Sequence, residues 1–219
     1  MNTLGYDFKD SWITLHGLSF ALRLGTTENI YAPDSAKLAV TEETNTVSYR
    51  ASGLQFAGGQ KTAEGEMALA VSCGGNGIFS VTGHALHAAQ RGLSLVLLVR
   101  GLGVEKLIGD SGNMPVTEVS EFRHSQAFSW PGRTATMPLV FLDCGGAPEA
   151  FALSRDTRVR RKVFAAHYDH ILHESVLVLS HQEDARVDTK RLELPLWEIG
   201  RGVPRAEVVK RRFDDLETN

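Results

Sequence analysis

Residues 66–85 read EMALAVSCGGNGIFSVTGHA and predict a β-hairpin. Apolar residues alternate with small or polar ones on both sides of a central Gly-Gly-Asn-Gly run, as they do in half-buried strands. Asn-Gly and the glycines beside it adopt positive φ at low cost, which suits a tight turn. On the second strand we expect one face to carry Ile78, Ser80, Thr82 and His84 and the other to carry Phe79, Val81 and Gly83.

Strand patterns continue in both directions from this hairpin. Before it, residues 11–24 predict two strands around Gly17, and residues 37–40 and 47–50 predict a second hairpin around a polar turn at 41–46. After it, residues 93–101 are apolar on both faces and predict a central strand, whereas residues 103–136 are expected to be rich in loops. Further strands are expected at 138–143, 150–154, 159–166, 175–180 and 192–195. So many short strands predict an all-β fold, a largely antiparallel β-sandwich.

The end of the chain departs from the strand pattern and predicts a short C-terminal helix over residues 204–217. Pro204 suits the first helical turn, and Val209, Phe213 and Leu216 fall on one face at helical spacing. We therefore divide the chain into a β-sandwich domain, residues 1–200, and a linker with a C-terminal helix, residues 201–219. The helix either closes the sandwich by docking on a sheet or leads into a further domain.

Composition excludes several classes of protein. The 219 residues include 23 Lys and Arg, 26 Asp and Glu and 42% hydrophobic residues, so wholesale disorder is excluded. The formal net charge of −3 argues against a broadly basic surface, and we expect no nucleic-acid partner. The longest apolar run, residues 93–99, is far shorter than the roughly 20 residues of a membrane helix, so we expect no membrane association. Residues 1–10 lack the pattern of a secretory signal, which predicts a cytoplasmic protein.

Motifs that suggest metal, redox or nucleophilic chemistry have simpler interpretations. Cys73 and Cys144 lack zinc-site spacing and are expected to be buried free thiols, with one disulfide as the alternative. Residues 109–112, GDSG, copy the centre of the trypsin-like serine protease signature, but the surrounding sequence differs and favours a surface turn. The triplet of histidines at 167, 170 and 173 does not share a strand face, so we expect no metal site and no cofactor.

A basic run and a pair of histidines leave two alternatives open. The run contains Arg155, Arg158, Arg160, Arg161 and Lys162. It is expected to form a solvated edge strand, with a surface for an anionic ligand or partner as the alternative. His84 and His87 have opposite parity on one strand, so they are not expected to share a ligand, although either one is a candidate general base.

Residues 122–133, FRHSQAFSWPGR, combine aromatic rings with cations and amides. A sugar ring has an apolar face and a polar rim, so such a combination suits a sugar site. We predict that carbohydrate is bound by His124, Trp130 and Arg133. The alternative is that Phe128 and Trp130 plug the end of the sandwich. Trp197 is expected to anchor the exit from the last strand.

The strand series that ends in residues 194–200, LPLWEIG, and then continues into a helix resembles the N-terminal β-sandwich of multidomain glycoside hydrolases. Such domains are often galactose-mutarotase-like super-sandwiches. The resemblance implies a non-catalytic accessory domain that supports domain packing or binds carbohydrate. It also implies a downstream catalytic barrel that carries the paired carboxylates. It places no catalytic residue in this chain, and the catalytic residues stay unknown.

Two other functions are kept as alternatives. The first is a self-contained sugar epimerase or mutarotase-like enzyme, in which His84, His124 or His167 works with a carboxylate such as Glu121 or Glu174. This enzyme requires a concave sheet that holds a histidine and a carboxylate a few ångströms apart. The second is a protein-interaction module that uses the basic run and the terminal helix to form a homo-oligomer or bind another partner.

Overall fold

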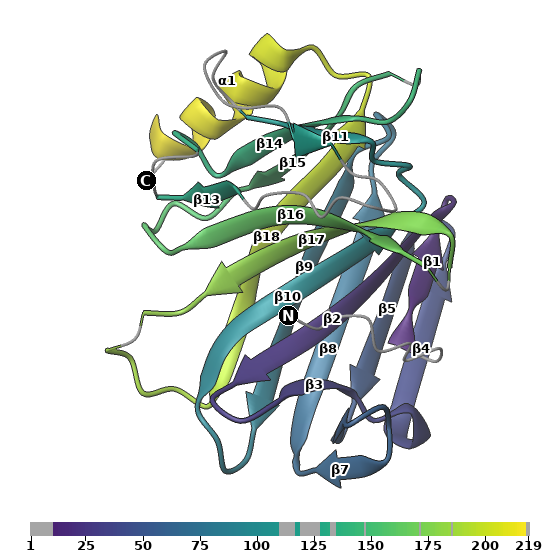
Figure 1. The fold of residues 1–219 in the computed structure, drawn as a ribbon, viewed down its shortest axis with the longest axis vertical. Coiled ribbons are helices and arrows are strands. Elements are labelled where there is room, and N and C mark those ends of the chain that lie inside the picture. The colour runs from purple at the N-terminus through teal and green to yellow at the C-terminus, as the bar shows by residue number, and fades with distance from the viewer. Residues whose placement is uncertain are drawn as a thin grey trace.

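The computed structural model describes residues 11–109, 117–118, 128–131, 135–146, 148–170, 172–184 and 186–217. These residues form two nine-stranded sheets, whose strand pairs are antiparallel, and one helix, α1 (Arg205–Glu217). The sheets lie face to face, and α1 lies at one end of the molecule (Figure 1). The prediction of an all-β, largely antiparallel sandwich with a short C-terminal helix is confirmed.

The first sheet is ordered β13-β16-β17-β10-β2-β3-β6-β7, and β1 also pairs with β2. Its strands are β1 (Ile13–Leu15), β2 (Leu18–Thr26), β3 (Ile30–Pro33), β6 (Leu54–Phe56), β7 (Lys61–Ala63), β10 (Gly92–Arg100), β13 (Phe128–Trp130), β16 (Lys162–Asp169) and β17 (Glu174–Gln182). Strand β10 is flanked by β2 and β17 and is buried on both faces, as the apolar pattern of residues 93–101 predicts.

The second sheet is ordered β12-β11-β14-β15-β18-β9-β8-β5-β4. Its strands are β4 (Leu38–Glu43), β5 (Thr46–Ala51), β8 (Gly65–Cys73), β9 (Phe79–His87), β11 (Lys106–Ile108), β12 (Thr117–Glu118), β14 (Leu139–Asp143), β15 (Ala150–Ser154) and β18 (Arg191–Arg201). A short 3-10 helix, η2 (Ser35–Lys37), precedes β4. The β8–β9 hairpin confirms the prediction made from residues 66–85.

The main core fills the space between the two sheets. Alternate residues of each strand point inward, so Phe20 and Leu22 of β2 face Val81 of β9 and their neighbours across the interface. Gly83 of β9 belongs to this inward face, where an added Cβ would lie 2.6 Å from the Ala68 carbonyl oxygen and 3.2 Å from Leu22. Its lack of a side chain lets the facing sheet approach closely.

Two smaller apolar clusters lie on the outer faces of the sheets. Helix α1 places Val208 over Leu139, Phe141, Phe151 and Leu153 on the outer face of β14 and β15. On the outer face of the first sheet, Trp12 packs on a cluster from β2, β10 and β17. Within the described residues, no helix is both long enough and apolar enough to cross a membrane.

Several boundaries differ from the sequence predictions. The region 103–136, expected to be loops, contributes the short strands β11, β12 and β13. Trp197 does not anchor an exit but lies within β18, fully buried against Phe164. On α1 the buried residues are Val208 and Arg212, whereas Phe213 and Leu216 are 52% and 50% exposed. Of the predicted face only Val209 packs on the outer cluster, because the helix buries Arg212 in place of Phe213 and Leu216.

The cysteines are free thiols, as predicted. Cys144 is buried, but Cys73 is only half-buried at the end of β8. Burial raises the pKa of both thiols, which makes them poor nucleophiles at neutral pH.

Candidate functional site

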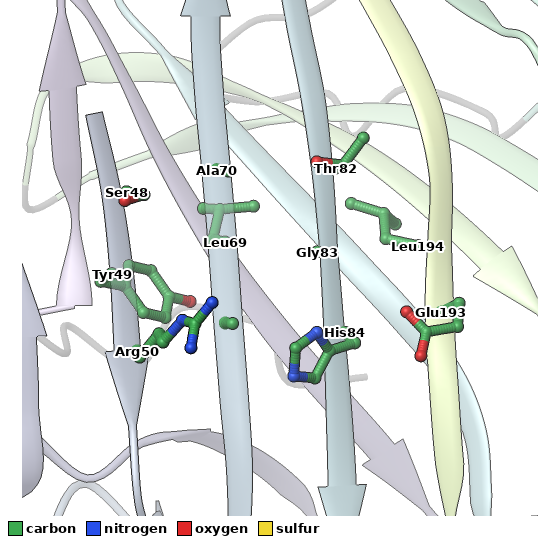
Figure 2. Close-up of a pocket in the computed structure, with 11 residues that line it drawn as sticks. Ser48, Tyr49, Arg50, Leu69, Ala70, Thr82, Gly83, His84, Glu193 and Leu194 are labelled. Atoms are coloured by element: carbon green, nitrogen blue, oxygen red, sulfur yellow. The ribbon is translucent and has the colours of Figure 1, made fainter. Parts of the chain in front are cut away.

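A pocket of about 290 Å³ opens on the outer face of the second sheet, away from α1. It lies across strands β5, β8, β9 and β18, and Figure 2 shows the residues that line it. The side chains of its outward positions are Ser48, Arg50, Ala68, Ala70, Thr82, His84 and Glu193. Inward neighbours such as Tyr49 and Leu69 belong to the core and reach the pocket from below.

Strand register brings these outward residues together. Arg50 pairs with Ala68, Ala68 with His84, and His84 with Glu193, so one row crosses four strands. The next row pairs Ser48 with Ala70 and Ala70 with Thr82. Neighbouring strands are about 4.8 Å apart, so Arg50 and His84 start about 10 Å from each other on the two sides of Ala68. The small alanines form the floor, and the longer side chains form the walls.

A β-bulge in β18 borders the pocket. The register between β18 and β9 shifts between Leu194 and Trp197, where Pro195 lacks the N–H that a regular ladder needs. A bulge bends its strand and increases the local twist. The edge of the pocket formed by Glu193 and Leu194 lies at this bend.

The carboxylates on this face are held by Arg191 and approached by His84. Arg191 contacts Glu66 through its Nη1 atom and Glu193 through its Nε atom, the latter at 2.7 Å from Oε1. The Nε2 atom of His84 lies 3.6 Å from Oε1 of Glu66. These carboxylates raise the pKa of Arg191, and the hydrogen bond with Glu193 is the largest cause. The β18 side of the site is therefore a group of paired charges.

Arg50 stands apart from this group on the β5 side. Its side chain is exposed and extends from β5 toward the side of the pocket that holds His84 (Figure 2). In the part of the chain that the structure describes, it forms no hydrogen bond and no ion pair, in contrast to Arg191. The pocket thus has at one end a cation that is unpaired within the described residues and, at the other, the Glu193 carboxylate paired with Arg191.

The residues predicted to bind carbohydrate are placed elsewhere or not described. His124 and Arg133 lie outside the described residues. Trp130 is half-buried in β13 of the first sheet, packs against the main core and donates a hydrogen bond from Nε1 to the Thr136 carbonyl oxygen at 3.1 Å. Its position fits the alternative of a plug at the end of the sandwich. Its role in sugar binding stays a prediction.

Other candidate residues are not brought into one site. His84 points outward and His87 inward, as parity predicts, and the His87 ring is buried against Tyr31. His167 lies on β16 of the first sheet, and Ser111 and Glu121 fall outside the described residues. Within the described residues, no three His, Cys, Asp or Glu side chains are arranged to hold a metal ion.

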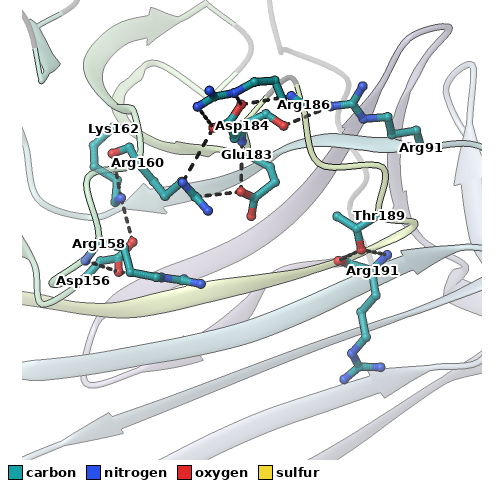
Figure 3. A network of polar contacts seen from close by, with 10 residues as sticks. All are labelled: Arg91, Asp156, Arg158, Arg160, Lys162, Glu183, Asp184, Arg186, Thr189 and Arg191. Carbon is teal, nitrogen blue, oxygen red and sulfur yellow. Dashed lines mark hydrogen bonds and ion pairs between the residues drawn. The ribbon is translucent and has the colours of Figure 1, made fainter.

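The basic run is not a solvated edge strand, because most of its cations are paired. Residues 155–161 precede β16. Figure 3 shows that Arg158 and Lys162 form ion pairs with Asp156 and that Arg160 forms an ion pair with Glu183. Lys162 is fully buried, with Nζ 2.9 Å from Oδ2 of Asp156 and 2.9 Å from the Arg160 carbonyl oxygen. Alternation along a strand could not reveal this, since Asp156 lies within the run and folds back onto Lys162, and Glu183 and Glu198 come from other segments.

His181 lies next to Lys162 in this network, facing the interior across the β16–β17 ladder. Burial, reinforced by the nearby Lys162 cation, lowers the pKa of His181 to about 4, although Asp156 and Glu183 oppose the shift. The imidazole is therefore neutral in the folded protein at neutral pH.

This shift predicts acid sensitivity. The unfolded chain binds a proton at His181 near pH 6.5 and the folded chain near pH 4, so stability is complete above pH 6.5 and falls as the pH drops to about 4. The loss over this window is roughly 3 kcal/mol. The free energy of unfolding, measured in urea, should fall less steeply with decreasing pH for His181→Leu than for wild type. His170→Leu, a change at an exposed histidine, should show the wild-type pH dependence. Equal slopes for all three proteins would contradict the assignment.

The fold and this face together define a β-sandwich protein with an open, polar pocket on one sheet. Compared with known proteins, the chain matches no protein-family model, and no curated protein sequence is significantly similar to it.

Sequence reasoning found part of this pocket. The face shared by Thr82 and His84 follows from alternation in residues 78–84. Arg50 and Glu193 were not identified, because their approach to His84 depends on which strands pair and in which register. The available signal was weak: Arg50 is a lone cation on a strand of otherwise neutral residues.

Proposed function

We propose that this β-sandwich binds carbohydrate in the pocket on the second sheet, as a non-catalytic accessory domain of a carbohydrate-active enzyme. The observation that carries the proposal is the lining of the pocket, which combines hydroxyl groups, a cation and a carboxylate around a floor of alanines. Sugar hydroxyls both donate and accept hydrogen bonds, and this lining offers partners of each kind. A volume of about 290 Å³ is near the lower end for small-molecule sites and suits one or two sugar rings.

The accessory role is supported by the far end of the molecule. The exposed side chains of Phe213 and Leu216 lie near the end of α1 and offer apolar surface to another domain. The catalytic carboxylates would then belong to that other domain, and the sandwich would tether the enzyme to its carbohydrate.

Filling the pocket floor is expected to abolish binding. Ala70→Phe places a large ring between Ser48 and Thr82, on an outward position where an aromatic residue is favourable for a strand. In isothermal titration calorimetry, Ala70→Phe should bind mono- and disaccharides at least tenfold more weakly than wild type does. Ala206→Phe makes the same change on an exposed helical residue outside the pocket and should bind normally. Unchanged binding by Ala70→Phe would reject this pocket as the sugar site.

One observation favours the epimerase or mutarotase alternative. His84 and Glu66 lie 3.6 Å apart on one sheet face, the arrangement of base and carboxylate that the alternative requires. Glu66 is also held by Arg191, which ties the carboxylate up in an ion pair and makes binding the better-supported function. Proton NMR of a bound sugar that shows no accelerated anomer exchange would exclude mutarotation.

A further inference from the structure

We infer that the pocket selects an acidic sugar, whose carboxylate lies between Arg50 and His84 over Ala68. This inference deepens the proposed function and rests on it. The sugar class is a uronic acid or a short chain that contains one, and the remaining hydroxyls face Thr82, Ser48 and Glu193.

The first reason is the uneven pairing of charges across the site. Arg191 is matched by Glu66 and Glu193, whereas Arg50 has no acidic partner within the described residues. An unpaired guanidinium presents a planar fork of donors that fits a carboxylate with two parallel hydrogen bonds. A neutral sugar would leave this part of the lining unused.

The second reason is the spacing. Arg50 and His84 flank Ala68 in one cross-strand row, and Ala68 occupies little space. The side chains of Arg50 and His84 point toward one another (Figure 2). A carboxylate placed there contacts the Arg50 guanidinium and accepts a hydrogen bond from the His84 ring. The opposite end of the row holds Glu193, whose carboxylate is already paired with Arg191 and accepts hydrogen bonds from hydroxyls. The row therefore also sets the direction in which the sugar lies.

The test compares matched pairs of sugars that differ in one group. Galacturonate and glucuronate, as monosaccharides and as short oligomers, are titrated beside their neutral galactose and glucose counterparts at low and high salt. Wild type should bind the acidic members at least tenfold more tightly, and this preference should shrink as salt increases. Arg50→Gln should lose the preference, because the affinity for acidic sugars falls to that for neutral ones, and Arg50→Lys should keep part of it.

A matched charge control separates local from overall electrostatics. Arg161→Gln removes the same charge from an exposed residue outside the pocket and should leave the preference intact. Equal affinity for acidic and neutral sugars in wild type would overturn this inference and leave the proposed function standing. No binding of any sugar would overturn both. If Arg50→Gln still prefers acidic sugars, the sugar carboxylate does not bind at Arg50, and the inference is wrong.

Discussion

Replacing Asp156 with asparagine is expected to lower the free energy of unfolding by about 3 kcal/mol, because the substitution leaves the Lys162 cation buried without its counter-ion. Lys162 is completely inaccessible, and its Nζ atom donates hydrogen bonds to the Asp156 carboxylate and the Arg160 carbonyl oxygen. Burial lowers the pKa of Lys162 despite the hydrogen bond to Asp156. Urea unfolding at pH 7, followed by circular dichroism, measures the change.

A double-mutant cycle identifies the cause. Lys162→Met removes the buried cation, and Asp156 still accepts hydrogen bonds from the Arg158 backbone and guanidinium. Lys162→Met should therefore cost less than Asp156→Asn, and the double variant should be more stable than Asp156→Asn alone. Purely additive losses would show that the two residues are not coupled.

Acid should weaken the same pair. Burial raises the pKa of Asp156, but the hydrogen bonds from Lys162 and Arg158 outweigh burial and the net pKa is lowered. The carboxylate thus contributes stability above its unfolded pKa, near 4, and loses it as the pH falls through the folded value. As the pH is lowered, this loss of stability occurs after the loss expected from protonation of His181.

Truncating Trp197 to alanine is expected to destabilise the fold by about 3–5 kcal/mol, since a large buried ring leaves a cavity that the sheets cannot fill. Trp197 is fully buried in β18, opposite Val81 of β9 and Ser154 of β15. Its ring meets Phe164 of the other sheet edge-on, with centroids 5.5 Å apart. Because domains of this kind are stable by only about 5–15 kcal/mol, the midpoint of urea unfolding should drop sharply.

Two variants serve as controls for this experiment. Trp197→Phe keeps an aromatic ring against Phe164 and removes an indole N–H that has no partner among the described residues, so it should cost less than half as much. Trp12→Ala removes a half-buried ring from the outer face of the first sheet and should also cost less. A loss below about 1 kcal/mol for Trp197→Ala would contradict tight packing between the sheets at this point.

The fold class could be read from the sequence because strand and turn signals are local. Alternation in residues 66–72 and 78–85 and the glycines between them specify the β8–β9 hairpin without help from distant residues. The same holds for the β4–β5 hairpin, although its strands extend further and leave only Thr44 and Asn45 in the turn. The helix at 205–217 was likewise visible from spacing and composition.

The site, the buried charges and the orientation of the helix were decided by the tertiary structure alone. Arg50, His84 and Glu193 come together because β5, β8, β9 and β18 are neighbours in the second sheet, an order that no local pattern encodes. Lys162 is buried because the chain before β16 folds Asp156 back onto its Nζ atom, and Arg212 is buried where Trp130 approaches it from another segment. The energy of placing a charge depends on the groups that surround it in space, so sequence alone determined which residues face each side of a strand, and the assembled sheets determined what they meet there.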